Sequence, residues 1–244
     1  DVLYPYRQDS DFFYLTGFLE PESVLILISG REQQQFLMFC RDRNVEREIW
    51  DGRRTGPEGA RLKYGADDAF PIENIDEILP KLLEGRGKIY YTAGKDANFD
   101  SFLTKTVKNN RGNAGSTGSS VELFVDLEQL LHELRLLKST EEQKIMEKAA
   151  TISARAHCRA MRSCAPGVYE YQLQAEIEHE FAMAGANSPA YGTIVGGGVN
   201  GCILHYVENN SKLKDGDLVL IDAGCELHNY AADITRTFPV NGKY

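Results

Sequence analysis

The sequence predicts an α/β domain followed by an α+β domain. Short apolar runs alternate with helical patterns over residues 1–110, and a segment rich in Gly, Ser and Asn follows at residues 109–120. After this segment the order changes to helices followed by a run of strands. Alternating strands and helices are typical of α/β layers, whereas helices followed by strands indicate an α+β domain. We therefore predict a first domain over residues 1–119 and a second over residues 120–244.

The elements of the first domain follow from its apolar runs and their periodicity. Short runs rich in branched and aromatic residues indicate buried strands. These predicted strands cover residues 23–29, 35–40 and 88–92. Helices are predicted from Pro57 onward, over residues 72–83 and over residues 96–107. A charged stretch rich in arginine, residues 41–54, separates the second strand from the first of these helices.

The second domain begins with three predicted helices. They cover residues 126–137, 139–164 and 169–183. The longest opens with Ser139 and Glu142 at the spacing of a capping box, in which each side chain bonds a backbone N–H of the other. Four strand signals follow, at residues 193–195, 203–206, 217–224 and 233–240.

Composition and charge exclude several classes of protein. Lys and Arg number 27 against 36 Asp and Glu, a formal net charge of −9, which disfavours nucleic-acid binding through phosphates. No apolar run approaches the ~20 residues of a membrane span, and no signal segment opens the chain. The five cysteines are odd in number and form no CxxC pair, which favours reduced thiols in a cytoplasmic protein. Because residue 1 is Asp and the last residues form a turn pattern, we expect an internal fragment of a longer protein.

A candidate metal site lies in the segment Leu218–Pro239. An apolar strand carries Asp222 in its interior, and a second strand carries Asp233. A two-residue turn at Leu227-His228 would place the two aspartates directly opposite, with Cβ atoms ~5 Å apart. Two carboxylates at that distance repel each other, and a divalent Mg, Mn or Ca ion between them removes the conflict. Two alternatives stay open: a hairpin slipped by one residue, or an aspartate that merely caps a turn.

Two further residues are candidates for function. His205 lies on the apolar strand signal at residues 203–206, where it is either a satisfied core histidine or a catalytic group. Trp50, the only tryptophan, lies among charged residues. It is either a surface-anchoring aromatic residue or a contact at an interface or substrate site.

Several segments together resemble one family, the pita-bread metallopeptidases, and within it the bacterial type of Xaa-Pro aminopeptidase (aminopeptidase P). In the second domain the similar segments are TIVGGGVNG, GCILHY, and DAG followed eleven residues later by the Asp of DITRTFP. In the first domain and at the junction they are YPYRQDSDFFYLTGFLEPESVLIL, REIWDGRRTG and HELRLLKSTEEQKIMEKA. The resemblance covers essentially the whole chain.

The resemblance implies a creatinase-like first domain and an incomplete pita-bread domain after it. It also implies two Mn²⁺ ions, with Asp222 and Asp233 among their ligands, and two-metal hydrolysis of peptides that have proline in second position. His205 matches a histidine that binds substrate and stabilises the reacting carbonyl. Trp50 and Arg53 match a substrate-binding loop that approaches the active site of a neighbouring subunit. A homo-oligomer, either a tetramer or a dimer, is therefore expected.

The chain departs from the family pattern in one respect. The family's remaining ligands, one histidine and a pair of glutamates, lie beyond Tyr244, so the chain alone is expected to bind metal weakly and to be inactive. Two other functions stay open: a prolidase, which cleaves only Xaa-Pro dipeptides, and a non-catalytic pita-bread binding module.

Overall fold

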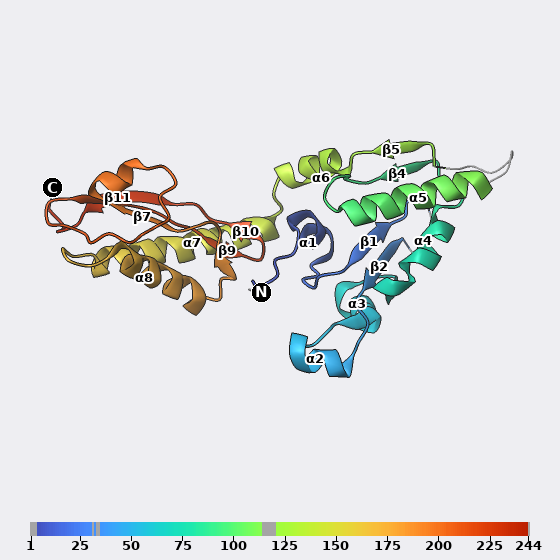
Figure 1. Cartoon of the computed structure of the whole chain (residues 1–244), viewed down its shortest axis with the longest axis horizontal. Coiled ribbons are helices and arrows are strands. Elements are labelled where there is room, and N and C mark those ends of the chain that lie inside the picture. The colour runs from blue at the N-terminus through green and yellow to red at the C-terminus, as the bar shows by residue number, and fades with distance from the viewer. Residues whose placement is uncertain (1–3, 31, 33–34, 114–120, 244) are drawn as a thin grey trace. The chain divides into compact units, whose positions relative to one another are not determined.

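The computed structural model describes residues 4–30, 32, 35–113 and 121–243, which form two compact units, Asp1–Leu136 and Leu137–Tyr244 (Figure 1). The domain boundary predicted between residues 119 and 120 lies outside the described residues. None of the helices in the described ranges has both the length and the apolar character needed to span a bilayer.

The first unit contains a three-stranded sheet in the order β1-β2-β3. Its strands are β1 (Val24–Leu27), β2 (Phe36–Cys40) and β3 (Asp68–Pro71). β1 and β2 pair antiparallel, whereas β2 and β3 pair parallel, and α3 (Gly56–Tyr64) packs against both β2 and β3. Neighbouring residues of β1 face different hydrophobic clusters: Leu25 packs against the cluster that contains Met38, and Ile26 packs against the cluster that contains Leu79. This alternation confirms the α/β character of the first unit.

The remainder of the first unit is built around a second, smaller sheet. β4 (Lys88–Tyr90) and β5 (Leu123–Val125) pair parallel. The helices nearby are α4 (Ile75–Leu83), preceded by a 3₁₀ turn (Ile72–Asn74), α5 (Ala97–Asn113) and α6 (Leu127–Leu136). α4 and α5 pack against each other, which confirms the helices predicted over residues 72–83 and 96–107, although α5 extends farther.

Two short helices of the first unit were not predicted. α1 (Ser10–Thr16) begins at Asp9, whose carboxylate accepts two backbone N–H bonds, and ends at Gly17 with φ 67°. α2 (Val45–Asp51) lies within the arginine-rich stretch, capped by Asn44, and buries none of its residues. Apolar periodicity does not reveal α2 because the helix has no buried face.

The second unit packs two helices on antiparallel sheets. α7 (Thr140–Ser163) opens with the predicted capping box, since Ser139 and Glu142 exchange side-chain to backbone bonds. α8 (Glu170–Met183) packs along α7. α7 contacts β9, and α8 contacts β7. The core between helices and sheets includes Ala149, Ile177 and Ile221, all fully buried.

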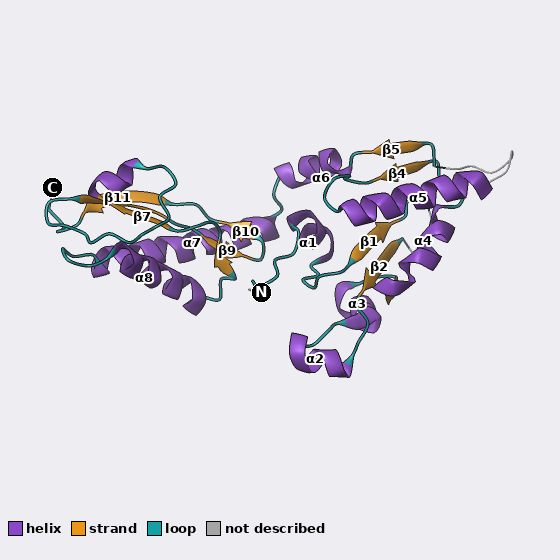
Figure 2. Cartoon of the chain, viewed as in Figure 1, coloured by secondary structure: helices purple, strands orange, loops and turns teal. Residues whose placement is uncertain are grey.

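The strands of the second unit, drawn in orange in Figure 2, form two three-stranded sheets with the orders β10-β9-β6 and β11-β8-β7. They are β6 (Ser188–Pro189), β7 (Ile194–Gly197), β8 (Leu218–Asp222), β9 (Cys225–Leu227), β10 (Tyr230–Ala231) and β11 (Thr235–Pro239). The prediction of a strand over residues 203–206 is wrong. These residues follow a 3₁₀ helix (Gly198–Cys202) and form a turn in which Leu204 is 89% exposed.

Candidate metal centre

The hairpin between the two candidate ligands turns one residue later than predicted. Its turn residues are His228 and Asn229, with φ of 49° and 62°, and Leu227 pairs with Tyr230. The predicted turn at Leu227-His228 is therefore wrong. A turn with left-handed φ at both central positions suits asparagine, which adopts this region far more readily than leucine.

The later turn moves Asp233 out of direct opposition to Asp222. Asp222 pairs instead with Thr235, and the register of the flanking bonds places Asp233 opposite Gly224. Moving the turn by one residue changes the pairing partner of each residue by two positions. Because side chains alternate along a strand, a change of two positions keeps both aspartates on the same face, as diagonal neighbours. Of the two alternatives, a slipped hairpin is thus realised, but the slip preserves the shared face.

Gly224 makes the close approach at this point possible. A Cβ atom on Gly224 would lie 1.8 Å from the carbonyl oxygen of Ala232 and 3.0 Å from the amide nitrogen of Asp233. No side chain fits in that space, so the backbone carrying Asp233 passes directly over the strand that carries Asp222.

The two carboxylates converge on the hydroxyl of Tyr191. The Tyr191 oxygen lies 2.6 Å from Oδ1 of Asp222 and 3.2 Å from Oδ1 of Asp233. Burial and the two neighbouring carboxylates raise the pKa of Tyr191 well above its usual value, so the hydroxyl stays protonated and acts as a donor. Sequence patterns alone do not reveal Tyr191, because its contacts with the two aspartates appear only when the strand pairings are known.

The donor set fits a hard divalent cation. Carboxylate oxygens are the ligands that Mg²⁺, Mn²⁺ and Ca²⁺ prefer, and both belong to one face of one hairpin. Within the described ranges, no group of three or more His, Cys, Asp or Glu side chains is arranged to hold a metal ion. Asp222 and Asp233 therefore offer two carboxylates, and a complete coordination shell would need further ligands.

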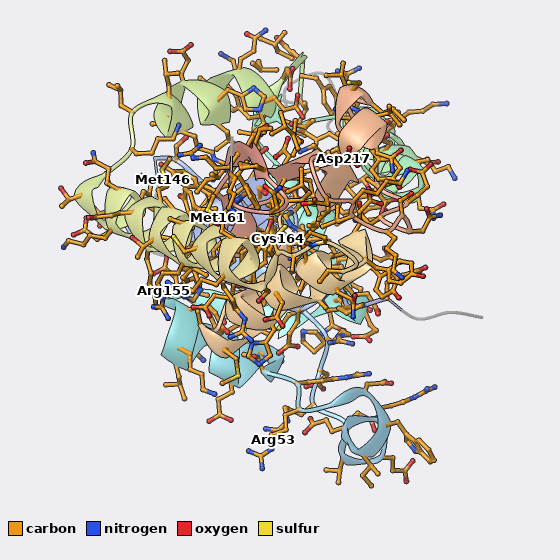
Figure 3. The ribbon with its side chains drawn as sticks, turned by 90° about the vertical axis from the view of Figure 1, so that its left-hand side faces the viewer. Arg53, Met146, Arg155, Met161, Cys164 and Asp217 are labelled. Atoms are coloured by element: carbon orange, nitrogen blue, oxygen red, sulfur yellow. The ribbon has the colours of Figure 1, made fainter. Side chains whose placement is uncertain are left out.

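The other predicted site residues are exposed. His205 lies in the turn after the 3₁₀ helix, not on an apolar strand, so the interpretation as a core histidine is wrong. Trp50 is 86% exposed on α2, and Arg53 is exposed just after α2, with its side chain extending away from the ribbon (Figure 3). Trp50 and Arg53 belong to the first unit, whereas Asp222, Asp233 and His205 belong to the second.

A buried carboxylate that the sequence analysis missed holds the segment that carries His205. Glu170 is fully buried at the start of α8. One of its oxygens accepts bonds from the Gly197 N–H and the Asn200 amide, at 2.8 and 3.0 Å. The other accepts bonds from the Tyr206 hydroxyl and the Ser211 N–H, both at 2.8 Å. One side chain thus bonds four donors that lie on both sides of His205 in the sequence.

Two family models and several known proteins are similar to this chain. The family model described as "Aminopeptidase P, N-terminal domain" matches residues 1–90, and the model of "Metallopeptidase family M24" matches residues 144–244. The chain is 47% identical over 245 residues to an Xaa-Pro aminopeptidase of Escherichia coli (strain K12), covering 100% of this chain and 56% of that relative.

The solved structures that resemble this chain are also aminopeptidase P structures. The aminopeptidase PepP of Pseudomonas aeruginosa matches with a TM-score of 0.95 at 56% identity, over 98% of this chain and 54% of that one. A zinc-substituted E. coli aminopeptidase P in complex with product matches with a TM-score of 0.96 at 47% identity, over 100% and 56% of the two chains.

The chain thus spans about half the length of the relatives that it matches. The two family models match in the order expected for a creatinase-like domain followed by part of a pita-bread domain. Residues 144–244 thus resemble metallopeptidase family M24, residues 1–90 resemble the N-terminal domain of aminopeptidase P, and the whole chain is similar to about half of aminopeptidase P.

Proposed function

We propose that the intact protein is a metal-dependent aminopeptidase that releases the N-terminal residue from peptides with proline in second position. Asp222 and Asp233 supply two of its metal ligands, and Mn²⁺ is its metal. The observation that carries the proposal is the convergence of these two carboxylates on one hydroxyl group. The relatives named Xaa-Pro aminopeptidase support the choice of substrate.

Each candidate residue has a separate task in this proposal. Bound divalent ions supply Lewis-acid polarisation of the scissile carbonyl and activation of water. Asp222 and Asp233 provide the negative charge that binds the ions on one side of the site. His205, exposed in its turn, donates a hydrogen bond to the oxygen on which charge develops. Trp50 and Arg53 contact the substrate from a neighbouring subunit.

The metal ligands are tested by Asp222→Asn and Asp233→Asn in the intact protein. Each variant is expected to lose bound Mn²⁺ and activity on an Xaa-Pro tripeptide together. Asp215→Asn is the matched control, because Asp215 is an exposed carboxylate on the loop before β8. Asp222→Asn with full metal content and normal turnover would contradict the assignment.

The substrate class is tested by comparing an Xaa-Pro dipeptide with an Xaa-Pro tripeptide. Cleavage of both, or of the tripeptide alone, supports an aminopeptidase, whereas cleavage of the dipeptide alone indicates a prolidase. Full metal content without cleavage of either peptide indicates a non-catalytic binding module.

The role of His205 is separable from metal binding. His205→Ala is expected to lower kcat by about 10²- to 10³-fold, the usual effect of removing one donor to developing charge, while Mn²⁺ content stays unchanged. Lost metal, with activity restored by excess Mn²⁺, would instead identify His205 as a ligand.

The proposal includes a homo-oligomer, either a tetramer or a dimer, in the cytoplasm. Val45, Ile49 and Trp50 of α2 are 75%, 77% and 86% exposed, and such an apolar helix surface suits a subunit contact. The five free cysteines suit a reducing compartment. Trp50→Ala is expected to weaken association, and sedimentation analysis of the intact protein measures it. A wild-type monomer would contradict the proposed assembly.

A further inference from the structure

Tyr191 lies on a bulge between two runs of strand pairing. Pro189 pairs with Cys225, and the Ala190 N–H donates to the Gly224 carbonyl at 2.9 Å. Pairing resumes at Ile194, which stands opposite Asp222. Residues 191–193 thus face the single residue 223. Extra residues in one strand bend it and change the direction of its side chains, and such bulges are frequent beside active sites.

Both ends of this bulge are fixed. At its beginning, the Ala190–Gly224 bond ties it to the strand segment that carries Asp222. At its end, Asn209 is 1% exposed, accepts the Val195 N–H at 2.9 Å and donates to the Thr193 carbonyl at 2.7 Å. The hydroxyl of Thr193 also donates to Glu178 on α8, at 3.3 Å. The position of the Tyr191 backbone is therefore set by the fold and not by its own side-chain contacts.

The hydroxyl of Tyr191 is the group that both carboxylates share. It is a neutral donor in contact with two like charges, so its dipole offsets part of the repulsion between Asp222 and Asp233. An anchored backbone with a half-buried ring presents this donor at one place in the site. Both carboxylates are thus drawn toward one proton at one place in the site.

We propose that Tyr191 is a positioning residue of the metal centre, whose hydroxyl holds Asp222 and Asp233 at one separation before the ions bind. The inference rests on the proposed function only in taking the two aspartates as metal ligands. Groups that orient metal ligands by hydrogen bonding typically contribute 10- to 100-fold in metal affinity. Removal of this hydroxyl is expected to weaken metal binding to that extent, without removing a ligand.

The test is Tyr191→Phe in the intact protein, which deletes only the hydroxyl. The metal-free protein is titrated with Mn²⁺ by calorimetry, and the dissociation constant is expected to rise about 10- to 100-fold. The matched control is Tyr91→Phe, because the Tyr91 hydroxyl also donates to an aspartate at 2.6 Å, but in the first unit. This control is expected to bind Mn²⁺ within about twofold of wild type, since Tyr91 contacts no ligand of the centre.

Two further measurements separate positioning from general damage. The metal-free Tyr191→Phe protein is expected to unfold within a few degrees of the Tyr91→Phe protein, and saturating Mn²⁺ is expected to restore its metal stoichiometry. Mn²⁺ binding by Tyr191→Phe that equals or exceeds that of wild type would overturn the inference while leaving the proposed function intact. Wild-type protein that binds Mn²⁺ but cleaves no Xaa-Pro peptide would overturn the proposed function while leaving the inference intact.

Discussion

The substitution Glu170→Gln tests how the segment that carries His205 is held in place. Glu170 is fully buried, and each of its four partners donates to it: the Gly197 N–H, the Asn200 amide, the Tyr206 hydroxyl and the Ser211 N–H. Glutamine has the same shape but only one acceptor oxygen. If that oxygen keeps Gly197 and Asn200, the new NH₂ group faces Tyr206 and Ser211.

The cost of this change can be estimated from the four bonds. The Tyr206 hydroxyl can rotate and become an acceptor, whereas the Ser211 N–H is left without a partner, at about 1–3 kcal/mol. The two bonds that remain lose the charge of the acceptor, about 1 kcal/mol each, and the lower cost of burying a neutral group offsets part of this. We expect a net loss of about 3 kcal/mol, seen as a Tm that is lower by several °C.

Thermal unfolding of the intact protein by calorimetry measures this loss. The control is Glu176→Gln on the same helix, because Glu176 pairs with Arg159 where both side chains are about one-third exposed. Such a surface pair contributes at most about 1 kcal/mol. At 25 °C, Glu170→Gln is also expected to lower kcat with Mn²⁺ content unchanged, since the displaced turn carries His205. Equal stability of the two variants would refute the reasoning.

Three further outcomes are expected. Gly224→Ala should reduce both stability and Mn²⁺ binding, because the new Cβ atom would lie 1.8 Å from the Ala232 carbonyl oxygen. Calorimetry and metal analysis measure the two effects, and wild-type stability with wild-type Mn²⁺ binding would contradict the close approach. Ser139→Ala should destabilise α7 by about 0.5–2 kcal/mol, seen as a lower Tm, through loss of the capping box. Burial raises the pKa of Cys40 to about 11, so alkylation of Cys40 should increase only as the pH rises toward that value. At pH 8, peptide mapping should find the exposed Cys158 alkylated first. Early labelling of Cys40 would contradict its burial.

Much of the fold is readable from local patterns. The strand β2 is a continuous apolar run because it is buried on both faces, and α7 combines a capping box with a stripe that includes Ala149, Ile152 and Ala156. Such signals depend on residues that are close in sequence, so they are visible before any tertiary contact is known. α2 shows the converse, since it is only seven residues long, lies among charged residues and buries none of its side chains.

The sequence alone also identified Asp222 and Asp233 as a candidate pair, because each lies beside apolar strand residues in one hairpin. What the tertiary structure decided is their register. The backbone conformation of His228 and Asn229 moves the turn by one residue, which changes direct opposition into a diagonal arrangement on the same face. A sequence pattern of period two cannot distinguish these two registers, since a shift of two residues preserves it.

Tyr191 and Glu170 belong wholly to the tertiary structure. Tyr191 lies 31 positions before Asp222 in the sequence, and Glu170 accepts bonds from residues that lie 27 to 41 positions after it. No local period encodes such contacts. They arise because strand pairing, a bulge and the end of a helix bring distant polar groups together, and burial then requires each group to find a partner. The sequence therefore determined most of the elements and the candidate pair of aspartates, whereas packing alone determined which side chains contact them.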